Sequence, residues 1–86
     1  MDINKLISIV KKKLVSQITI QNIKIEDKSF LHKGHKGNES NKFHLKLTID
    51  SNELSKLGKI DSNRKIYKIL ETELEKHIHS LQILIN

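Results

Sequence analysis

Apolar residues recur every three or four positions over the first fifteen residues of the chain. This spacing, i, i+3, i+4, i+7, places them on one face of an amphipathic helix. The residues that follow it are Ile3, Leu6, Ile7, Val10 and Leu14. Asp2 stands directly before them, and aspartate is a preferred N-terminal cap. The pattern therefore predicts a helix that begins after Asp2 and buries one face.

Three segments alternate between apolar and other side chains, which is the pattern of a half-buried strand. The segment QITIQNIKIED (17–27) has apolar pairs at 18, 20 and at 23, 25, so we interpret it as one strand interrupted by a bulge or short turn at Gln21-Asn22. KFHLKLTID (42–50) alternates without interruption, with His44 on its polar face. HSLQILIN (79–86) closes the chain as a third strand. Residues 27–41, polar and glycine-containing, predict a long loop.

Two helices are predicted between the second and third strands. Asp50 or Ser51 can cap a short helix that stops at Gly58. Asp61 or Ser62 can cap the longest helical pattern, whose apolar positions are Ile66, Tyr67, Leu70, Leu74 and Ile78. Its outward positions are predicted to be Glu71, Glu73, Glu75 and Lys76. At its C-terminal end, His77 suits a capping role.

These elements predict an α/β chain of the α+β kind, in the order α-β-β-α-α-β. Consecutive strands are most simply antiparallel, whereas a two-helix crossover makes the third strand parallel to the second. We expect a small three-stranded mixed sheet with helices packed on one face. The third strand then starts at the sheet edge where the second starts, so His79 and the loop histidines His32 and His35 can face one partner.

The composition narrows the possible functions. The 86 residues fit one domain, 1–86, with a small core. The chain has no cysteine, which excludes a disulfide framework and a self-contained thiolate metal site. Its first residues have neither the pattern of a signal peptide nor that of a membrane span, so we predict a cytoplasmic protein with no membrane partner. No catalytic constellation is recognisable, which indicates that it is not an enzyme.

A net charge of +6 invites a nucleic-acid role, although Arg64 is the one arginine among sixteen basic residues. Basic residues gather around the predicted interhelical turn: Lys56, Lys59, Arg64, Lys65 and Lys68. They form either a solvated face or a surface for a partner or for phosphate. The GHKG string (34–37) fits the G-x-x-G phosphate clamp of KH domains, but that clamp joins two helices and this string joins two strands.

Four separate segments resemble the BolA family over about residues 18–85. DKSFLHKGHKG, FHLKL, SNRKIYKILETEL and IHSLQI stand where that family has approximately D-E-S-x-x-H, H-F-x-V, R-H-R-x-V-Y-x-x-L and V-H-A-L. The resemblance implies a class II KH-like fold and a chain that binds a monothiol glutaredoxin. It also implies a 2Fe-2S cluster that is shared with the glutaredoxin and glutathione, with no cofactor on the isolated protein, which would be a monomer alone and a heterodimer with its partner.

By this resemblance the ligand histidines are His79 and a loop histidine, either His32 or His35. His44 is expected to be structural or to support the site. Ser62-Asn63-Arg64 replaces the family's R-H-R, which weakens the case for the rival function, a KH-like nucleic-acid-binding transcriptional regulator. A divalent-metal site made of histidines alone is the least supported alternative.

Overall fold

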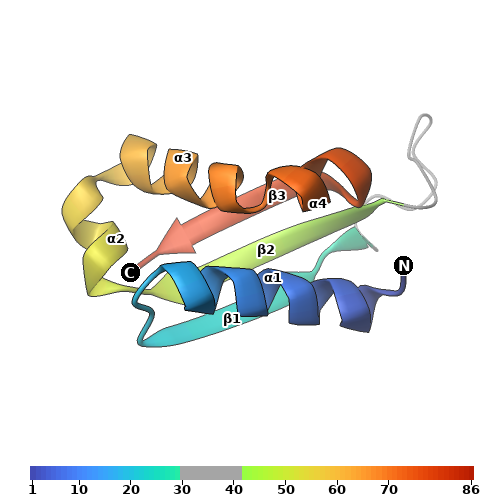
Figure 1. The fold of residues 1–86 in the computed structure, drawn as a ribbon, viewed down its shortest axis with the longest axis horizontal. Coiled ribbons are helices and arrows are strands. Elements are labelled where there is room, and N and C mark those ends of the chain that lie inside the picture. The colour runs from blue at the N-terminus through green and yellow to red at the C-terminus, as the bar shows by residue number, and fades with distance from the viewer. Residues whose placement is uncertain (30–41) are drawn as a thin grey trace.

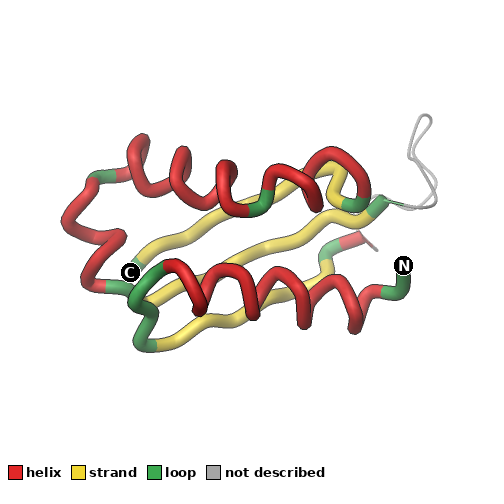
Figure 2. Tube along the Cα trace, viewed as in Figure 1, coloured by secondary structure: helices red, strands yellow, loops and turns green. Residues whose placement is uncertain are grey.

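The structure, a computed structural model, describes residues 1–29 and 42–86. Its helices and strands follow one another as α1 (Ile3–Gln17), β1 (Asn22–Asp27), β2 (Phe43–Asp50), α2 (Asn52–Leu57), α3 (Lys59–Ile69), α4 (Glu71–Lys76) and β3 (Ile78–Ile85). The helices lie on one face of a mixed sheet and leave the other face open (Figures 1 and 2). The predicted α+β arrangement is confirmed, with one additional helix break.

Helix α1 begins and ends for identifiable reasons. The Asp2 carboxylate accepts a hydrogen bond from the Lys5 backbone N–H at 2.9 Å, as its predicted capping role requires. Leu6, Val10 and Leu14 are fully buried. At the other end, the Ile18 N–H donates to the Leu14 carbonyl in the last turn. The predicted interrupted strand is therefore wrong in its first half, because Ile18 ends the helix and the strand starts at Asn22.

The sheet has the order β1-β2-β3, so β2 is central and both other strands are edges. Strands β1 and β2 are antiparallel, and β2 and β3 are parallel, as predicted. On the helix side, β2 buries Leu45, Leu47 and Ile49. The alternation in KFHLKLTID thus identified the buried face correctly. Because the helices cover this face alone, the side chains between these residues lie on the open face.

The β2–β3 pairing contains a bulge at His79. Phe43 is opposite Ile78, but the next pair is His44 and Ser80, so His79 is an extra residue on β3. Ile78 is buried, His79 and Ser80 are both exposed, and Leu81 is half-buried. The extra residue therefore places two consecutive side chains on the open face.

Helices α2 to α4 differ in detail from the sequence pattern. Ser51 caps α2, its hydroxyl accepting from the Leu54 N–H at 3.1 Å. Helix α3 begins at Lys59, so the predicted cap at Asp61 or Ser62 is wrong: Gly58, with φ of 82°, turns the chain directly from one helix into the next. A break at Leu70 separates α3 from α4, and Ile78 belongs to β3.

Two side chains of this region differ from their predictions in whether they are buried or exposed. Tyr67 was predicted in the apolar stripe but is 45% exposed, and its hydroxyl lies at 3.5 Å from the Leu81 carbonyl. Glu73 was predicted to face solvent but is 6% exposed, because its carboxylate pairs with Lys13 of α1 at 2.8 Å. Glu73 follows the buried residues Ile66 and Leu70 at helical spacing, so its side chain lies on the covered face of this region.

Candidate functional site

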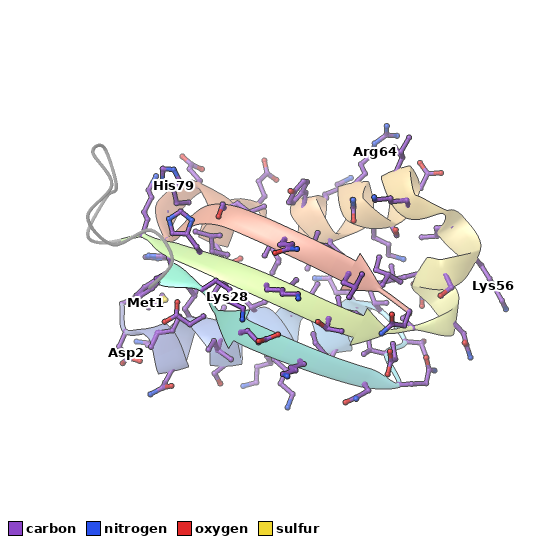
Figure 3. The ribbon with its side chains drawn as sticks, turned by 180° about the vertical axis from the view of Figure 1, so that it is seen from behind. Met1, Asp2, Lys28, Lys56, Arg64 and His79 are labelled. Atoms are coloured by element: carbon purple, nitrogen blue, oxygen red, sulfur yellow. The ribbon has the colours of Figure 1, made fainter. Side chains whose placement is uncertain are left out.

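The candidate site lies on the open face of the sheet where β2 and β3 start. Figure 3 shows His79 at this end of the sheet, with its ring beside the starts of both strands. Its ring centroid is 5.0 Å from that of His44, and the two planes are tilted by 43°. Strand pairing and the bulge bring together two imidazoles that are 35 positions apart in the sequence.

His44 is held on several sides. Its ring Nδ1 lies 2.6 Å from the Ser80 hydroxyl, a hydrogen bond between directly paired residues of β2 and β3. Its backbone N–H donates to the Ser29 hydroxyl at 3.1 Å, and its carbonyl accepts from the Lys28 N–H at 2.7 Å. The residue is 5% exposed. His79, by contrast, is exposed. The cluster therefore consists of one fixed, buried imidazole beside one accessible imidazole.

The two other predicted ligands, His32 and His35, lie outside the described residues, as does the GHKG string. The described residues that flank this segment are Ser29 and Lys42. Ser29 contacts His44, as described, and Lys42 precedes Phe43, whose N–H donates to the His77 carbonyl at 2.9 Å. Both flanking residues therefore belong to the end of the sheet that carries His79.

The open face near the cluster carries an ion pair. Lys28 Nζ lies 3.0 Å from the Glu26 carboxylate. This hydrogen bond lowers the pKa of Glu26 below its usual value, and the charges of Lys24, Lys28 and Lys46 lower it further. The surface beside the histidines thus combines one ionised carboxylate with three ammonium groups.

His77 is the C-cap residue of α4, the position predicted for it. Its backbone N–H donates to the Glu73 carbonyl at 2.8 Å. Its position in the chain, directly before β3, fixes the entry of the chain into the strand that carries His79. The hydrogen bonds that the structure describes for His77 are made by its backbone.

The predicted basic residues lie toward the opposite end of the molecule, on α2 and α3. Figure 3 shows Lys56 at the end of the molecule farthest from His79 and Arg64 on the outer side of α3. Lys65 pairs with Glu53 at 2.7 Å, and Arg64 lies 3.7 Å from Asp61. Lys56, Lys59 and Lys68 are exposed. The structure therefore gives Lys65 a structural partner and leaves the exposed lysines spread over two helices.

A groove of about 360 Å³ lies beside this basic region, between the α2–α3 turn and β3. Its walls include Gly58, Lys59 and Asn63 on the helical side and Ile83 and Leu84 on the strand side. Leu84 is 48% exposed. The groove and the histidine cluster therefore lie at opposite ends of β3.

Sequence reasoning underestimated two residues of the histidine cluster, His44 and Ser80. Alternation placed His44 on the open face, and the parallel β2–β3 prediction placed the start of β3 beside it. The unpredicted feature was the bulge, which pairs His44 with Ser80 rather than with His79. Within residues 1–29 and 42–86, no group of three or more His, Cys, Asp or Glu side chains could hold a metal ion.

The fold and this arrangement define an α+β domain with an accessible histidine on its open sheet face. The chain matches the family model described as BolA-like protein over residues 14–86, and it belongs to this family. A DNA-binding transcriptional regulator BolA from Haemophilus influenzae is 31% identical over 75 residues, which cover 87% of this chain and 70% of that protein.

Two Arabidopsis thaliana proteins extend the comparison. Protein BOLA1, chloroplastic, is 29% identical over 77 residues, covering 86% of this chain and 48% of that protein. The solved BolA domain of SufE1 superposes with a TM-score of 0.78 at 26% identity and covers 92% of this chain and 87% of that one. The family and fold predicted from the four sequence segments are confirmed. In the part of the chain that the structure describes, no helix has both the length and the hydropathy to cross a bilayer.

Proposed function

We propose that this chain is a non-enzymatic adaptor that binds a monothiol glutaredoxin and co-ligates a bridged 2Fe-2S cluster. In this proposal His79 is one ligand, and His32 or His35 is the other. The observation that carries it is the exposed His79 ring at a β-bulge, on the end of the sheet where the described chain stops at Ser29 and resumes at Lys42. The role would be in cluster assembly or trafficking, or in iron regulation.

The donor chemistry fits such a shared cluster. Neutral imidazole ligates iron in Rieske-type centres, where two histidines replace two thiolates on one iron. This chain supplies no thiolate because it has no cysteine. The sulfur ligands would come from the glutaredoxin cysteine and from glutathione. A cluster whose ligands are divided between two proteins is suited to transfer and sensing, since separation of the partners removes part of the ligand set.

The test is to mix the protein with a cluster-loaded monothiol glutaredoxin and to record visible circular dichroism. We expect wild type to give a complex with a spectrum distinct from that of the glutaredoxin alone, and His79→Ala to lose that difference. His77→Ala is the matched control. It removes an imidazole two residues away and leaves in place the backbone hydrogen bonds of residue 77. An unchanged spectrum in His79→Ala would contradict the ligand assignment.

Single and double replacement of the loop histidines separates their roles. If one of them is the second ligand, either His32→Ala or His35→Ala alone changes the spectrum. If they substitute for one another, the change requires the double variant. Retention of the wild-type spectrum by the double variant would remove both from the ligand set. Size-exclusion chromatography with light scattering checks the accompanying expectation of a monomer alone and a heterodimer with the partner.

A second candidate function is a nucleic-acid-binding transcriptional regulator. It is supported by the groove beside Gly58 and Lys59 and by the similarity to the Haemophilus influenzae DNA-binding transcriptional regulator BolA. Binding through ammonium groups releases counterions, so the affinity for DNA fragments should fall steeply with salt. We expect Lys59→Gln to weaken binding and lower the salt slope, whereas Lys11→Gln, on exposed α1 surface, leaves both unchanged. Binding insensitive to salt would reject this function.

The predicted cytoplasmic location is part of the same proposal, and the chloroplast named for BOLA1 is that relative's compartment. A fluorescent fusion observed in the cells that make the protein tests it. Diffuse cytoplasmic signal is expected, and concentration of the signal in an organelle would contradict it.

A further inference from the structure

We propose that His44 is a positioning residue for His79: its buried imidazole, fixed by Ser80, holds the His79 ring in the orientation in which it binds the metal. This inference rests on the proposed function of His79. It concerns residues 29, 44, 79 and 80, all of which the structure describes. It assigns a role to a residue of the central strand that would otherwise be one polar position on the open face.

His44 has little conformational freedom of its own. It sits on the central strand, is 5% exposed, and is bound to neighbours through both its backbone and its ring. Ser80, which holds Nδ1 at 2.6 Å, is its register partner on β3. A hydrogen bond between paired residues of adjacent strands fixes the ring relative to the sheet.

His79, by contrast, is not held by strand pairing. As the extra residue of a bulge it has no register partner on β2, and its side chain is exposed. The ring contact described for it is with His44, at 5.0 Å between centroids and a tilt of 43°. His44 therefore forms the rigid surface against which the His79 ring rests.

Residues beside a metal-ligating histidine set its ring orientation, and their loss typically weakens metal binding by 10-fold or more. In this chain the support combines a ring contact with a hydrogen bond from β2 to β3. Ser80 stands where the V-H-A-L pattern has alanine, so the hydroxyl that holds the His44 ring is a feature in which this chain departs from that pattern.

Two substitutions separate the ring from the hydrogen bond. His44→Phe keeps an aromatic ring beneath His79 and removes the bond to Ser80, whereas His44→Asn keeps a polar group near the Nδ1 position and removes the ring. Ser80→Ala is a milder variant that removes the hydroxyl bonded to the His44 ring without altering the core. Lys46→Gln, on the same face of β2 two residues further along, is the matched control.

The first measurement uses the free protein at one fixed pH. Proton–carbon correlation spectra of the histidine rings, with the His79 signals assigned by their loss in His79→Ala, report the environment and mobility of that ring. We expect His44→Asn to shift and sharpen the His79 signals toward those of a freely moving side chain, and His44→Phe to keep a ring-contact shift. Identical His79 signals in His44→Asn and wild type would overturn the inference.

The second measurement uses the complex with cluster-loaded glutaredoxin. We expect His44→Asn to alter the visible circular dichroism and to lose the cluster to a chelator about ten-fold faster than wild type, with Ser80→Ala intermediate and Lys46→Gln unchanged. If wild type forms no complex, the proposed function fails. If wild type forms the complex and His44→Asn and Ser80→Ala behave as wild type, this inference alone fails. Should His44→Asn not fold, Ser80→Ala carries both measurements.

Discussion

Glu73 of α4 and Lys13 of α1 form an ion pair whose two members differ in exposure. The Lys13 ammonium donates to both carboxylate oxygens, at 2.9 and 2.8 Å. The side chain of Glu73 is 8% exposed and that of Lys13 is 38% exposed. The pair joins α1 and α4 through two residues that are 60 positions apart in the sequence. Its removal should therefore depend on which member is replaced.

We expect Lys13→Met to lower the free energy of unfolding by about 2–3 kcal/mol, because it leaves the buried carboxylate without its partner. Glu73→Gln should cost less, about 1 kcal/mol, since the Lys13 ammonium that remains can reach water. Urea unfolding measures both. Lys12→Met, on exposed surface of the same helix, is the control and should stay within about 0.5 kcal/mol of wild type. Equal losses in the two pair variants would contradict this asymmetry.

Single residues also show which contacts could be predicted from the sequence and which could not. The capping residues Asp2 and Ser51 were predictable, because a cap acts on N–H groups two or three positions away. Glu73 was not, because its neighbours Glu71 and Glu75 make the helix appear acidic and solvated, and its partner is distant in the sequence. The interaction of His44 with Ser80 depends likewise on a pairing register that the alternation of one strand does not contain.

At the scale of elements, the short helix α2 is fastened through Glu53. Its carboxylate accepts from the Lys65 ammonium of α3 at 2.7 Å and from the Thr19 N–H, which follows α1, at 3.0 Å. The Lys65 hydrogen bond, followed by that of Thr19, lowers the pKa of Glu53 below its usual value. One carboxylate thus connects α2, α3 and the segment that leads into β1.

Because the pKa of Glu53 is lowered in the folded protein, the free energy of unfolding depends on pH. A carboxylate whose pKa is lower in the folded state contributes stability above its unfolded pKa of about 4.5 and loses it as the pH falls through the folded value. We expect Glu53→Gln to be less stable than wild type near neutral pH and to lose less stability on acidification. Urea midpoints measured between neutral and acid pH check this. Glu75→Gln, on exposed α4 surface, is the control, and parallel curves for Glu53→Gln and wild type would contradict the assignment.

Element types were more predictable than their junctions. Periodicity identified α1, β2 and β3 because each buries one regular face. The stop of α2 at Gly58 was predicted and is confirmed. The break at Leu70 depends on how α4 packs, so the apolar pattern predicted α3 and α4 as one helix, beginning after Asp61 or Ser62 rather than at Lys59. The bulge at His79 could not be predicted from the apolar pattern either, because Leu81, Ile83 and Ile85 alternate in the same way with or without the extra residue.

At the scale of the whole molecule, the two proposed sites are separated by the length of the sheet. The molecule extends 39 Å along its longest axis, with His79 toward one end and Lys56 at the other (Figure 3). The core between them is a single cluster, which includes α1, the sheet, α2, α3 and Leu70. The predicted topology placed His79 at the edge of the sheet where β2 starts, because parallel β2 and β3 start at the same edge. It did not predict the opposite groove, which forms where helices and strand meet in space.

Substitution of a core residue and substitution of the proposed ligand should affect stability and the spectrum of the complex in different ways. Leu14 is fully buried in the last turns of α1. We expect Leu14→Ala to lower the free energy of unfolding by about 2–5 kcal/mol, because the substitution leaves a cavity. The fraction of Leu14→Ala that stays folded keeps His44, Ser80 and His79 in place, so its complex with cluster-loaded glutaredoxin should give the wild-type spectral shape at reduced amplitude. His79→Ala should do the reverse: its exposed ring contributes little to stability, within about 0.5 kcal/mol, while the spectral shape changes. Urea unfolding and visible circular dichroism on the same samples make the comparison. A changed spectral shape in Leu14→Ala would mean that the ligand geometry depends on the packing of α1 as well as on the contacts at the start of β2 and β3.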